Sequence, residues 1–150
     1  MSQQKTTESN NLPLEQLLRQ QVKLAEGIDF AEFMAQALYH PEYGYYMVER
    51  DRIGKGGDFF TSSSVNALFG RLVARQMAQM AELLADEEFQ VVEQGAGEGH
   101  LALDILNALH EEFPALYDRT SYSLVVLSPD NRQRQSRLLD KHGERVSWCS

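Results

Sequence analysis

The sequence has only one cysteine, Cys149, in 150 residues. A single thiol can form neither an internal disulfide nor a cysteine-rich zinc site. The run His110-Glu111-Glu112 lacks the second histidine of the zinc motif H-E-x-x-H, and the other histidines have no partner at the spacing of metal ligands. The sequence therefore predicts no metal site and no disulfide framework, which is consistent with a reducing compartment.

Basic residues are also scarce, with 14 lysines and arginines against 22 acidic residues and a formal net charge of -8. Nucleic-acid affinity depends largely on lysine and arginine side chains that neutralise phosphates. This imbalance argues against DNA or RNA as a partner. The remaining composition, 43% hydrophobic and 24% charged, is ordinary for a globular protein and provides core material for one domain of usual size.

No apolar run approaches the roughly 18 residues that a membrane-spanning helix needs. Residues 1–11 contain no apolar segment of the secretory kind, and they lack the arginines of a mitochondrial presequence. We therefore expect a soluble protein with no membrane partner, located in the bacterial cytoplasm rather than in mitochondria. The polar residues 1–12 are expected to form a disordered tail.

Helical periodicity dominates the first half of the chain. Apolar residues at helical spacing predict helices over about residues 14–25, 30–38 and 65–84. Residues 39–61, rich in glycine and tyrosine, are too irregular for one regular element and predict a structured loop. We group residues 13–88 as a helical N-terminal extension that includes this loop.

Strand and helix patterns alternate after residue 88, which is typical of a parallel α/β sheet. Strands are expected at about 89–94, 121–127 and 145–149, and helices at about 99–112 and 129–142. Right-handed crossovers would place the three strands side by side. We therefore interpret residues 89–150 as the first half of a Rossmann-like cofactor-binding domain.

Glycines follow the first of these strands at every second position, as Gly95, Gly97 and Gly99. Glycine lets the backbone reach positive φ and leaves no Cβ between the chain and a ligand, and the helix that follows presents unpaired N–H groups. The pattern predicts a site for a nucleotide-like cofactor at the carboxyl end of the strand. An ordinary tight turn is the alternative interpretation.

The spacing of these glycines narrows the choice of cofactor. A dinucleotide motif G-x-G-x-x-G/A needs a third small residue at position 100, which is His100. A P-loop is excluded because Gly54-Lys55-Gly56-Gly57 lacks the required spacing. The pattern that fits is E-x-G-x-G-x-G from Glu93 to Gly99, which resembles the first motif of Rossmann-like S-adenosylmethionine-dependent methyltransferases. That resemblance implies that the loop backs onto the methionine and ribose part of the cofactor.

Three further stretches point the same way. They are Phe30-x-x-Phe33-Met34-x-x-Ala37-Leu38-Tyr39-x-Pro41-x-x-Gly44-Tyr45-Tyr46, then Gly57-Asp58-Phe59-x-Thr61-Ser62 with Phe69-Gly70, and Leu124-Val125 through Ser128-Pro129 with Arg132 and Gln135. Together they resemble the MidA family of methyltransferases, from about residue 28 to the end of the chain. The resemblance implies an α/β, Rossmann-like methyltransferase fold with a helical N-terminal extension, and S-adenosylmethionine as cofactor. It also implies a protein substrate, because a mitochondrial member methylates an arginine on a subunit of respiratory complex I.

The resemblance also implies roles for single residues. Gly95, Gly97 and Gly99 would allow close approach of the backbone to the cofactor, and Glu93 would accept from loop N–H groups or face the cofactor's ammonium group. A lid over the site would include three polar residues, Asp58, Thr61 and Ser62. No catalytic side chain is assigned, because in-line methyl transfer from a sulfonium mainly requires that two reactants be oriented.

The chain departs from the family pattern in two places. It has Thr61-Ser62-Ser63-Ser64 where the family usually has Thr-Ser-Pro-Glu, and Val126 where the family has the glutamate that holds the cofactor ribose. A charge-assisted hydrogen bond is worth on the order of 1.5–3 kcal/mol, so its loss would weaken cofactor binding roughly 10- to 150-fold. Ser128 or Asp130 could compensate in part.

Alternatives to the enzyme stay open at this point. Val126 favours a non-catalytic assembly or binding protein that keeps the fold, while a nicotinamide-dependent oxidoreductase is disfavoured by His100. The tyrosines near position 43 could attract a guanidinium in an acceptor pocket or belong to the core; they are Tyr39, Tyr43, Tyr45 and Tyr46.

The chain ends just after the third expected strand. In this fold the first strand lies inside the sheet, so the predicted sheet is incomplete and one edge of it is unpaired. We therefore expect the N-terminal part of a longer protein, with possible self-association through the unpaired edge.

Overall fold

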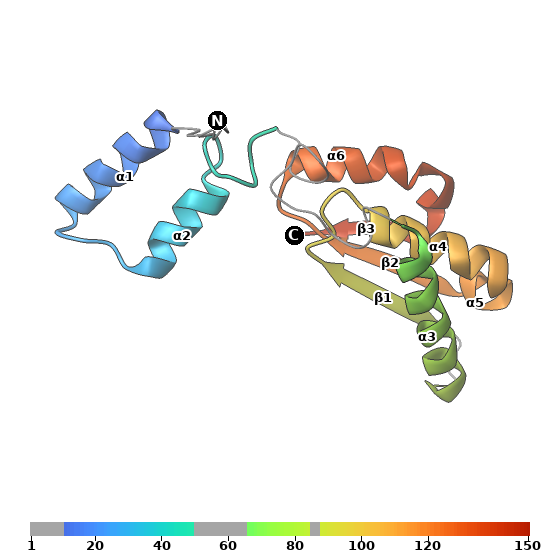
Figure 1. Ribbon diagram of the computed structural model, residues 1–150. Coiled ribbons are helices and arrows are strands. Elements are labelled where there is room, and N and C mark those ends of the chain that lie inside the picture. Colours follow the sequence, from blue (N-terminus) through green and yellow to red (C-terminus); the bar gives the residue numbers. More distant parts are fainter. Residues whose placement is uncertain (1–10, 50–65, 85–87) are drawn as a thin grey trace, which may run out of the picture. The chain divides into compact units, whose positions relative to one another are not determined.

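The computed structural model describes residues 11–49, 66–84 and 88–150. The chain forms two compact units, residues 1–49 and residues 50–150 (Figure 1). The predicted lid residues Asp58, Thr61 and Ser62 lie outside the described residues. No helix in the described ranges is long and apolar enough to cross a membrane.

The first unit is a pair of helices, α1 (Leu12–Leu24) and α2 (Phe30–Tyr39). Each begins at a polar cap: Asn11 Oδ1 accepts from the N–H of Leu14 at 3.4 Å, and Asp29 Oδ1 accepts from the N–H of Glu32 at 2.7 Å. Such caps satisfy backbone donors that the first turn of a helix leaves free. α2 lies where the sequence predicted it, whereas α1 begins at Leu12, so the end of the segment expected to be a disordered tail is helical.

The second unit is a three-stranded parallel sheet with helices. Its elements, in chain order, are α3 (Leu68–Leu84), β1 (Phe89–Gln94), α4 (His100–Glu112), α5 (Pro114–Asp118), β2 (Thr120–Val125), α6 (Pro129–Leu138), the 3-10 helix η2 (Asp140–Arg145) and β3 (Val146–Cys149). The strand order is β1-β2-β3, and both pairings are parallel. The predicted α/β class and parallel sheet are therefore confirmed.

One face of this sheet carries the core. Val91, Tyr122 and Leu124 are buried there together with apolar residues of α3, α4 and α5 and with Val146 of β3, and the register places Val91 beside Tyr122. The alternate positions are exposed or half-buried, and Val92 and Ser147 are among the exposed ones. Serine and glutamine hold most places on this second face, so it lacks the continuous apolar run of a strand buried on both sides.

After β1, the largest differences from the expectation are two boundaries and one additional helix. β2 ends at Val125 rather than at residue 127, because Ser128 is already the cap of α6. The helix expected to reach residue 142 ends at Leu138 and continues as η2. The short helix α5 was missed: it has five residues and begins with Pro114 in its first turn, too short to show a helical period.

Candidate functional site

The glycine loop lies between the carboxyl end of β1 and the start of α4. Its three glycines all have positive φ: 76° at Gly95, 56° at Gly97 and 93° at Gly99. Residues other than glycine rarely adopt this backbone conformation, because their Cβ comes too close to the following carbonyl oxygen. The bend expected from the glycine spacing is therefore present, and Gly99 is the N-cap of α4, with no side-chain hydrogen bond capping the helix.

The glycines face different surroundings. A Cβ built on Gly95 would meet no atom within 4 Å, so this part of the loop borders open space. A Cβ on Gly99 would lie 3.1 Å from Cγ of Gln135 and 3.6 Å from Cδ1 of Leu139. Gly95 is therefore the position that leaves room for a ligand, whereas Gly99 also allows the loop to pack closely against α6 and the residue that follows it.

Glu93 lies on β1, one residue before the strand ends and two residues before Gly95. Its Oε2 accepts a hydrogen bond of 2.8 Å from the hydroxyl of Tyr122, which is 1% exposed on β2. Burial raises the pKa of the Glu93 carboxyl, and the hydrogen bond from Tyr122 opposes that rise. Burial and the neighbouring carboxylate raise the pKa of Tyr122. A half-buried carboxylate at this place can attract a cation, which would lower its pKa again.

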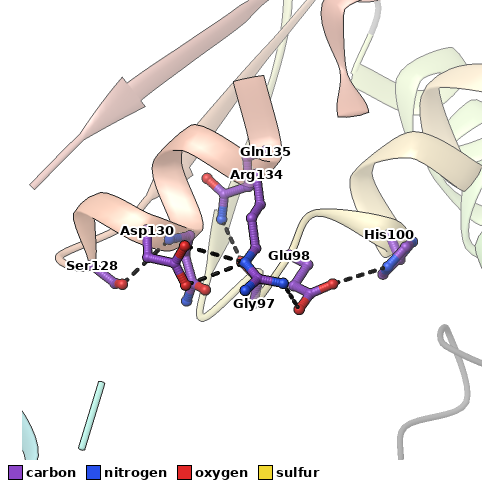
Figure 2. A network of polar contacts seen from close by, with 8 residues as sticks. Gly97, Glu98, His100, Ser128, Asp130, Arg134 and Gln135 are labelled. Atoms are coloured by element: carbon purple, nitrogen blue, oxygen red, sulfur yellow. Dashed lines mark hydrogen bonds and ion pairs between the residues drawn. The ribbon is translucent and has the colours of Figure 1, made fainter. Parts of the chain in front are cut away.

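Two polar side chains of α6 form hydrogen bonds with the glycine loop (Figure 2). Gln135 Nε2 donates to the carbonyl of Gly97 at 2.7 Å, and Arg134 Nη1 donates to Glu98 Oε1 at 3.1 Å. Glu98 lies between Arg134 and His100, whose Nε2 is 3.6 Å from Glu98 Oε2. A hollow of about 380 Å³ adjoins this network and is lined by Glu98, His100, Arg134, Arg137 and Leu138.

The end of β2 is occupied by contacts within the chain. The Val126 N–H donates to the carbonyl of Cys149 at 2.9 Å, so the backbone there continues the pairing with β3. Ser128 is 4% exposed and its hydroxyl oxygen accepts from the N–H of Asn131 at 3.3 Å. Asp130 pairs with Arg134 at 3.2 Å. Ser128 and Asp130, the two residues that could replace the family's glutamate, therefore already make contacts within α6 and its cap.

The tyrosine cluster lies in the first unit, around the turn after α2. The rings of Tyr39 and Tyr46 stack with centroids 5.6 Å apart, and Tyr45 meets Tyr46 edge-on at 4.9 Å. Tyr39 is 43% exposed and the other three are half-buried. The cluster is therefore a partly exposed aromatic surface, and its role as a pocket stays a prediction.

Tyr122 and Arg134 were not anticipated as members of this site, and Gln135 was noted only as part of a family pattern. The alternation of β2 places Tyr122 on the inward face, and Gln135 shares a helical spacing with Leu139 and His142, which are buried. These spacings show that both side chains point inward. They do not show which loop the side chains reach, because that depends on the pairing of β1 with β2 and on the packing of α6.

The glycine loop is the part of the described structure that fits an adenosyl cofactor. The bend at Gly95 is a backbone surface that a Cβ would fill, and Glu93 precedes it by two residues on β1, where its carboxylate accepts from Tyr122. No charged acceptor for a ribose stands at Val126. The donor set therefore suits the methionine end of such a cofactor better than its ribose.

Comparison with known families gives a direct match. Residues 72–150 match the family described as S-adenosyl-L-methionine-dependent methyltransferases. In Drosophila melanogaster, the protein named "Protein arginine methyltransferase NDUFAF7 homolog, mitochondrial" is 38% identical over 103 residues, which cover 68% of this chain and 23% of the relative. The Bos taurus protein of the corresponding name is 35% identical over 137 residues, covering 89% of this chain and 30% of the relative.

A solved structure agrees with this result. It is a COG1565 superfamily member from Burkholderia thailandensis, crystallised with S-adenosyl-homocysteine, and it matches with a TM-score of 0.80 and 30% identity over 100% of this chain and 40% of that protein. The chain thus spans less than half the length of the relatives it matches. The family match covers more than half of the chain and includes the glycine loop with its partners on α6. The chain therefore belongs to the MidA family of S-adenosylmethionine-dependent methyltransferases.

Proposed function

We propose that this chain provides the S-adenosylmethionine-binding part of a methyltransferase that acts on arginine in a protein. The observation that carries this proposal is the bend at Gly95, which has positive φ and open space where a Cβ would stand. Family membership and the names of the relatives, several of them protein arginine methyltransferases, support the cofactor and the class of acceptor.

The cofactor supplies a methyl group activated by a sulfonium. The chain's own contribution is to bind and orient, which is the main requirement of an in-line displacement. The backbone of the glycine loop offers a surface without side chains, and the N-terminus of α4 offers N–H groups to a carboxylate. The Glu93 carboxylate offers a negative partner to an ammonium group. Tyr122 holds that carboxylate in place through a 2.8 Å hydrogen bond.

Titration calorimetry with S-adenosylhomocysteine tests the proposal. The Gly95→Ala variant puts a methyl group into the open space, and we expect its affinity to fall about tenfold or more, equivalent to ~1.4 kcal/mol. Gly27→Ala is the matched control, since Gly27 also has positive φ (138°) with no atom within 4 Å of an added Cβ. Folded wild-type protein that releases no heat at millimolar ligand would rule out cofactor binding by this chain.

A non-catalytic binding or assembly protein is the second candidate, and the half-buried Val126 favours it. Restoring the family's glutamate separates the two functions. In an enzyme with weakened ribose binding, Val126→Glu should tighten the cofactor by roughly 10- to 150-fold, the value of a charge-assisted hydrogen bond of 1.5–3 kcal/mol. A site that has lost its cofactor altogether should gain nothing from this change.

The acceptor and the location belong to the same proposal. A respiratory-complex subunit is a candidate acceptor, and peptide arrays from such subunits, assayed with radioactive cofactor and the whole protein, would test it. The matched arginine methyltransferases are named as mitochondrial, whereas the matched structure comes from Burkholderia thailandensis. We propose the bacterial cytoplasm, which fractionation of the source cells would check.

We also propose that copies of the chain associate through β1. In the described sheet β1 pairs with β2 alone, and an unpaired strand edge can pair with another chain. Sedimentation velocity over a range of concentrations should show a reversible dimer. The dimer should weaken in Val92→Lys, because Val92 is 61% exposed on this strand and an edge lysine opposes pairing. A monomer at every concentration would contradict the proposal.

A further inference from the structure

Gln135 is an unusual residue for the middle of α6. The helix is rich in charged and polar side chains, yet Gln135 is 0% exposed. Burying an amide without hydrogen bonds costs free energy, so a fully buried glutamine is expected to have partners for both ends of its amide. Gln135 has them: Nε2 donates to the Gly97 carbonyl at 2.7 Å, and Oε1 accepts from Nε1 of Trp148 at 3.0 Å.

The two partners fix the orientation of the amide. The Gly97 carbonyl can only accept a hydrogen bond, and the indole N–H of Trp148 can only donate one. A rotated amide would place its oxygen against the carbonyl and its NH₂ against the indole N–H, which would break both bonds. Gln135 therefore connects the glycine loop to β3 in a single arrangement.

The same side chain also sets how closely the loop can approach α6. Gly99 packs on it, since a Cβ at Gly99 would lie 3.1 Å from Cγ of Gln135. The preceding residue, Arg134, holds the neighbouring loop residue Glu98 at 3.1 Å, as Figure 2 shows. The Arg134 side chain is 30% exposed, and ion pairs of such exposure contribute little. The buried Gln135 is therefore the main polar contact between α6 and the loop.

We propose that Gln135 is a positioning residue for the cofactor site: its amide holds Gly97 in the left-handed conformation in which the loop receives the cofactor. This inference rests on the proposed function as far as the cofactor is concerned. A loop already held in its binding conformation does not have to be ordered when the ligand arrives, so the contact increases affinity without touching the ligand. The link to Trp148 extends the same arrangement to β3.

Four variants of the whole chain, one of them a control, test the role of the amide. Gln135→Glu keeps the shape and an acceptor for Trp148 but loses the donor to Gly97, whereas Gln135→Leu loses both hydrogen bonds. Gln133→Glu is the matched control, because Gln133 is exposed on the same helix. Trp148→Phe removes the indole N–H together with part of the ring but keeps the Gln135 donor to Gly97. It provides a further variant should the buried carboxylate prevent folding.

The first measurement needs no cofactor. The Gly99 N–H is hydrogen-bonded to the carbonyl of Ala96 at 2.9 Å, within the loop, so its hydrogen exchange reports the closed bend. We expect Gly99 to exchange at least about tenfold faster in the Gln135 variants, a loss of ~1.4 kcal/mol in local protection. Exchange at Leu106, which is 0% exposed in α4, reports global unfolding and should change less. Trp148→Phe should give a smaller acceleration at Gly99.

The second measurement adds S-adenosylhomocysteine. The dissociation constant should rise about tenfold in Gln135→Glu and stay at the wild-type value in Gln133→Glu. Trp148 is the chain's only tryptophan, so its fluorescence should change on cofactor addition in wild type and not in Gln135→Leu. Unchanged local exchange at Gly99 in both Gln135 variants would overturn the inference. A wild-type chain that binds no cofactor would defeat the proposed function, while the exchange data would still decide whether Gln135 positions the loop.

Discussion

His142 is a buried side chain outside the candidate site, 5% exposed on η2. Its Nδ1 lies 2.7 Å from the Tyr117 hydroxyl and its Nε2 lies 3.0 Å from Asn107 Oδ1. Because an amide oxygen only accepts, Nε2 must carry the proton and Nδ1 must accept from Tyr117. The neutral imidazole thus joins α4, α5 and η2. Burial, reinforced by the charges of Lys141, His110 and Arg145, lowers the pKa of His142 below its usual 6.5.

This network predicts a pH-dependent stability. A base with a lowered pKa in the folded state contributes its full stability above the unfolded pKa and loses it as the pH falls through the folded pKa. We expect the free energy of unfolding, measured with urea, to decrease as the pH is lowered from about 7 to about 5. His142→Gln should remove this component and cost about 1–3 kcal/mol at neutral pH, since it leaves buried partners unpaired. His100→Gln is the control. If the free energy of unfolding of His142→Gln depended on pH as strongly as that of wild type, His142 would not be the group responsible.

The pair Tyr122 and Glu93 gives a second prediction at this scale. Tyr122→Phe removes the 2.8 Å hydrogen bond to a carboxylate, so we expect a loss of about 1.5–3 kcal/mol in unfolding free energy at neutral pH. It should also raise the pKa of Glu93 further, because the hydrogen bond is what opposes the effect of burial. The carboxyl resonance of Glu93, followed by NMR against pH, measures that shift.

A double-mutant cycle provides the control for this pair. In a Glu93→Gln background the acceptor no longer carries a charge, so Tyr122→Phe should cost clearly less than it does in wild type. Equal costs in the two backgrounds would mean that the hydroxyl and the carboxylate do not interact in solution.

The conformation of the glycine loop could be predicted from the sequence, whereas its partners could not. The spacing of Gly95, Gly97 and Gly99 after a strand determines where positive φ is needed, since only glycine adopts it at low cost. The contacts Gln135 to Gly97 and Tyr122 to Glu93 join residues 38 and 29 positions apart. They depend on strand register and helix packing, which no local pattern contains.

At the scale of elements, α3 and α4 cross closely because one face of α3 is made of small residues. Gly70, Ala74, Ala78 and Ala81 are its buried positions. At Gly70 an added Cβ would collide with the Cβ of Asp104 and lie 3.2 Å from its carbonyl carbon.

Ion pairs also join the two helices. Arg71 and Arg75 of α3 both pair with Glu112 of α4, at 2.7 Å and 2.9 Å, and they lower the pKa of that carboxyl.

Gly70→Ala is therefore expected to destabilise the protein although alanine is the better helix former. The gain in helix propensity is about 0.5–1 kcal/mol, whereas overpacking against a neighbouring helix costs about 1–3 kcal/mol. Thermal unfolding should show a net loss. Gly143→Ala is the control, because nothing lies within 4 Å of its added Cβ, and it should be neutral or slightly stabilising. A melting temperature for Gly70→Ala at or above that of wild type would show that the two helices can move apart.

The two elements that flank the glycine loop were predicted best from the sequence. β1 matched at both ends and α4 differed by one residue, because the glycines mark where the strand ends and where the helix begins. The polar and charged composition of α6 continues into η2, where the backbone forms a 3-10 helix that ends at Arg145. Composition and periodicity do not distinguish these two helix types, so the boundary could not be located.

At the scale of the whole molecule, the two units differ in how they are stabilised. The unit of residues 50–150 contains the sheet and nearly all of the buried apolar residues, from Ala74 to Val146. In the described part of residues 1–49 only Leu14 and Gly44 are buried, while Leu24 and Phe30 are 79% and 76% exposed. The sequence showed the apolar periodicity of both helices in the smaller unit. Periodicity alone does not tell whether an apolar face has a partner, so the weak core of this unit could not be predicted.

The smaller unit should therefore not fold by itself. Its helices have 13 and 10 residues, and isolated helices shorter than about 12–15 residues are marginal in water. A peptide of residues 11–49 should show little helix by far-UV circular dichroism and no cooperative melting, although trifluoroethanol should induce the two helices. A chain that lacks residues 1–49 should keep its cooperative unfolding, because the sheet and its helices are retained. A peptide that melts cooperatively would show instead that contacts within the first unit, such as the 2.7 Å hydrogen bond from Asn11 to the Tyr43 carbonyl, are sufficient to stabilise it.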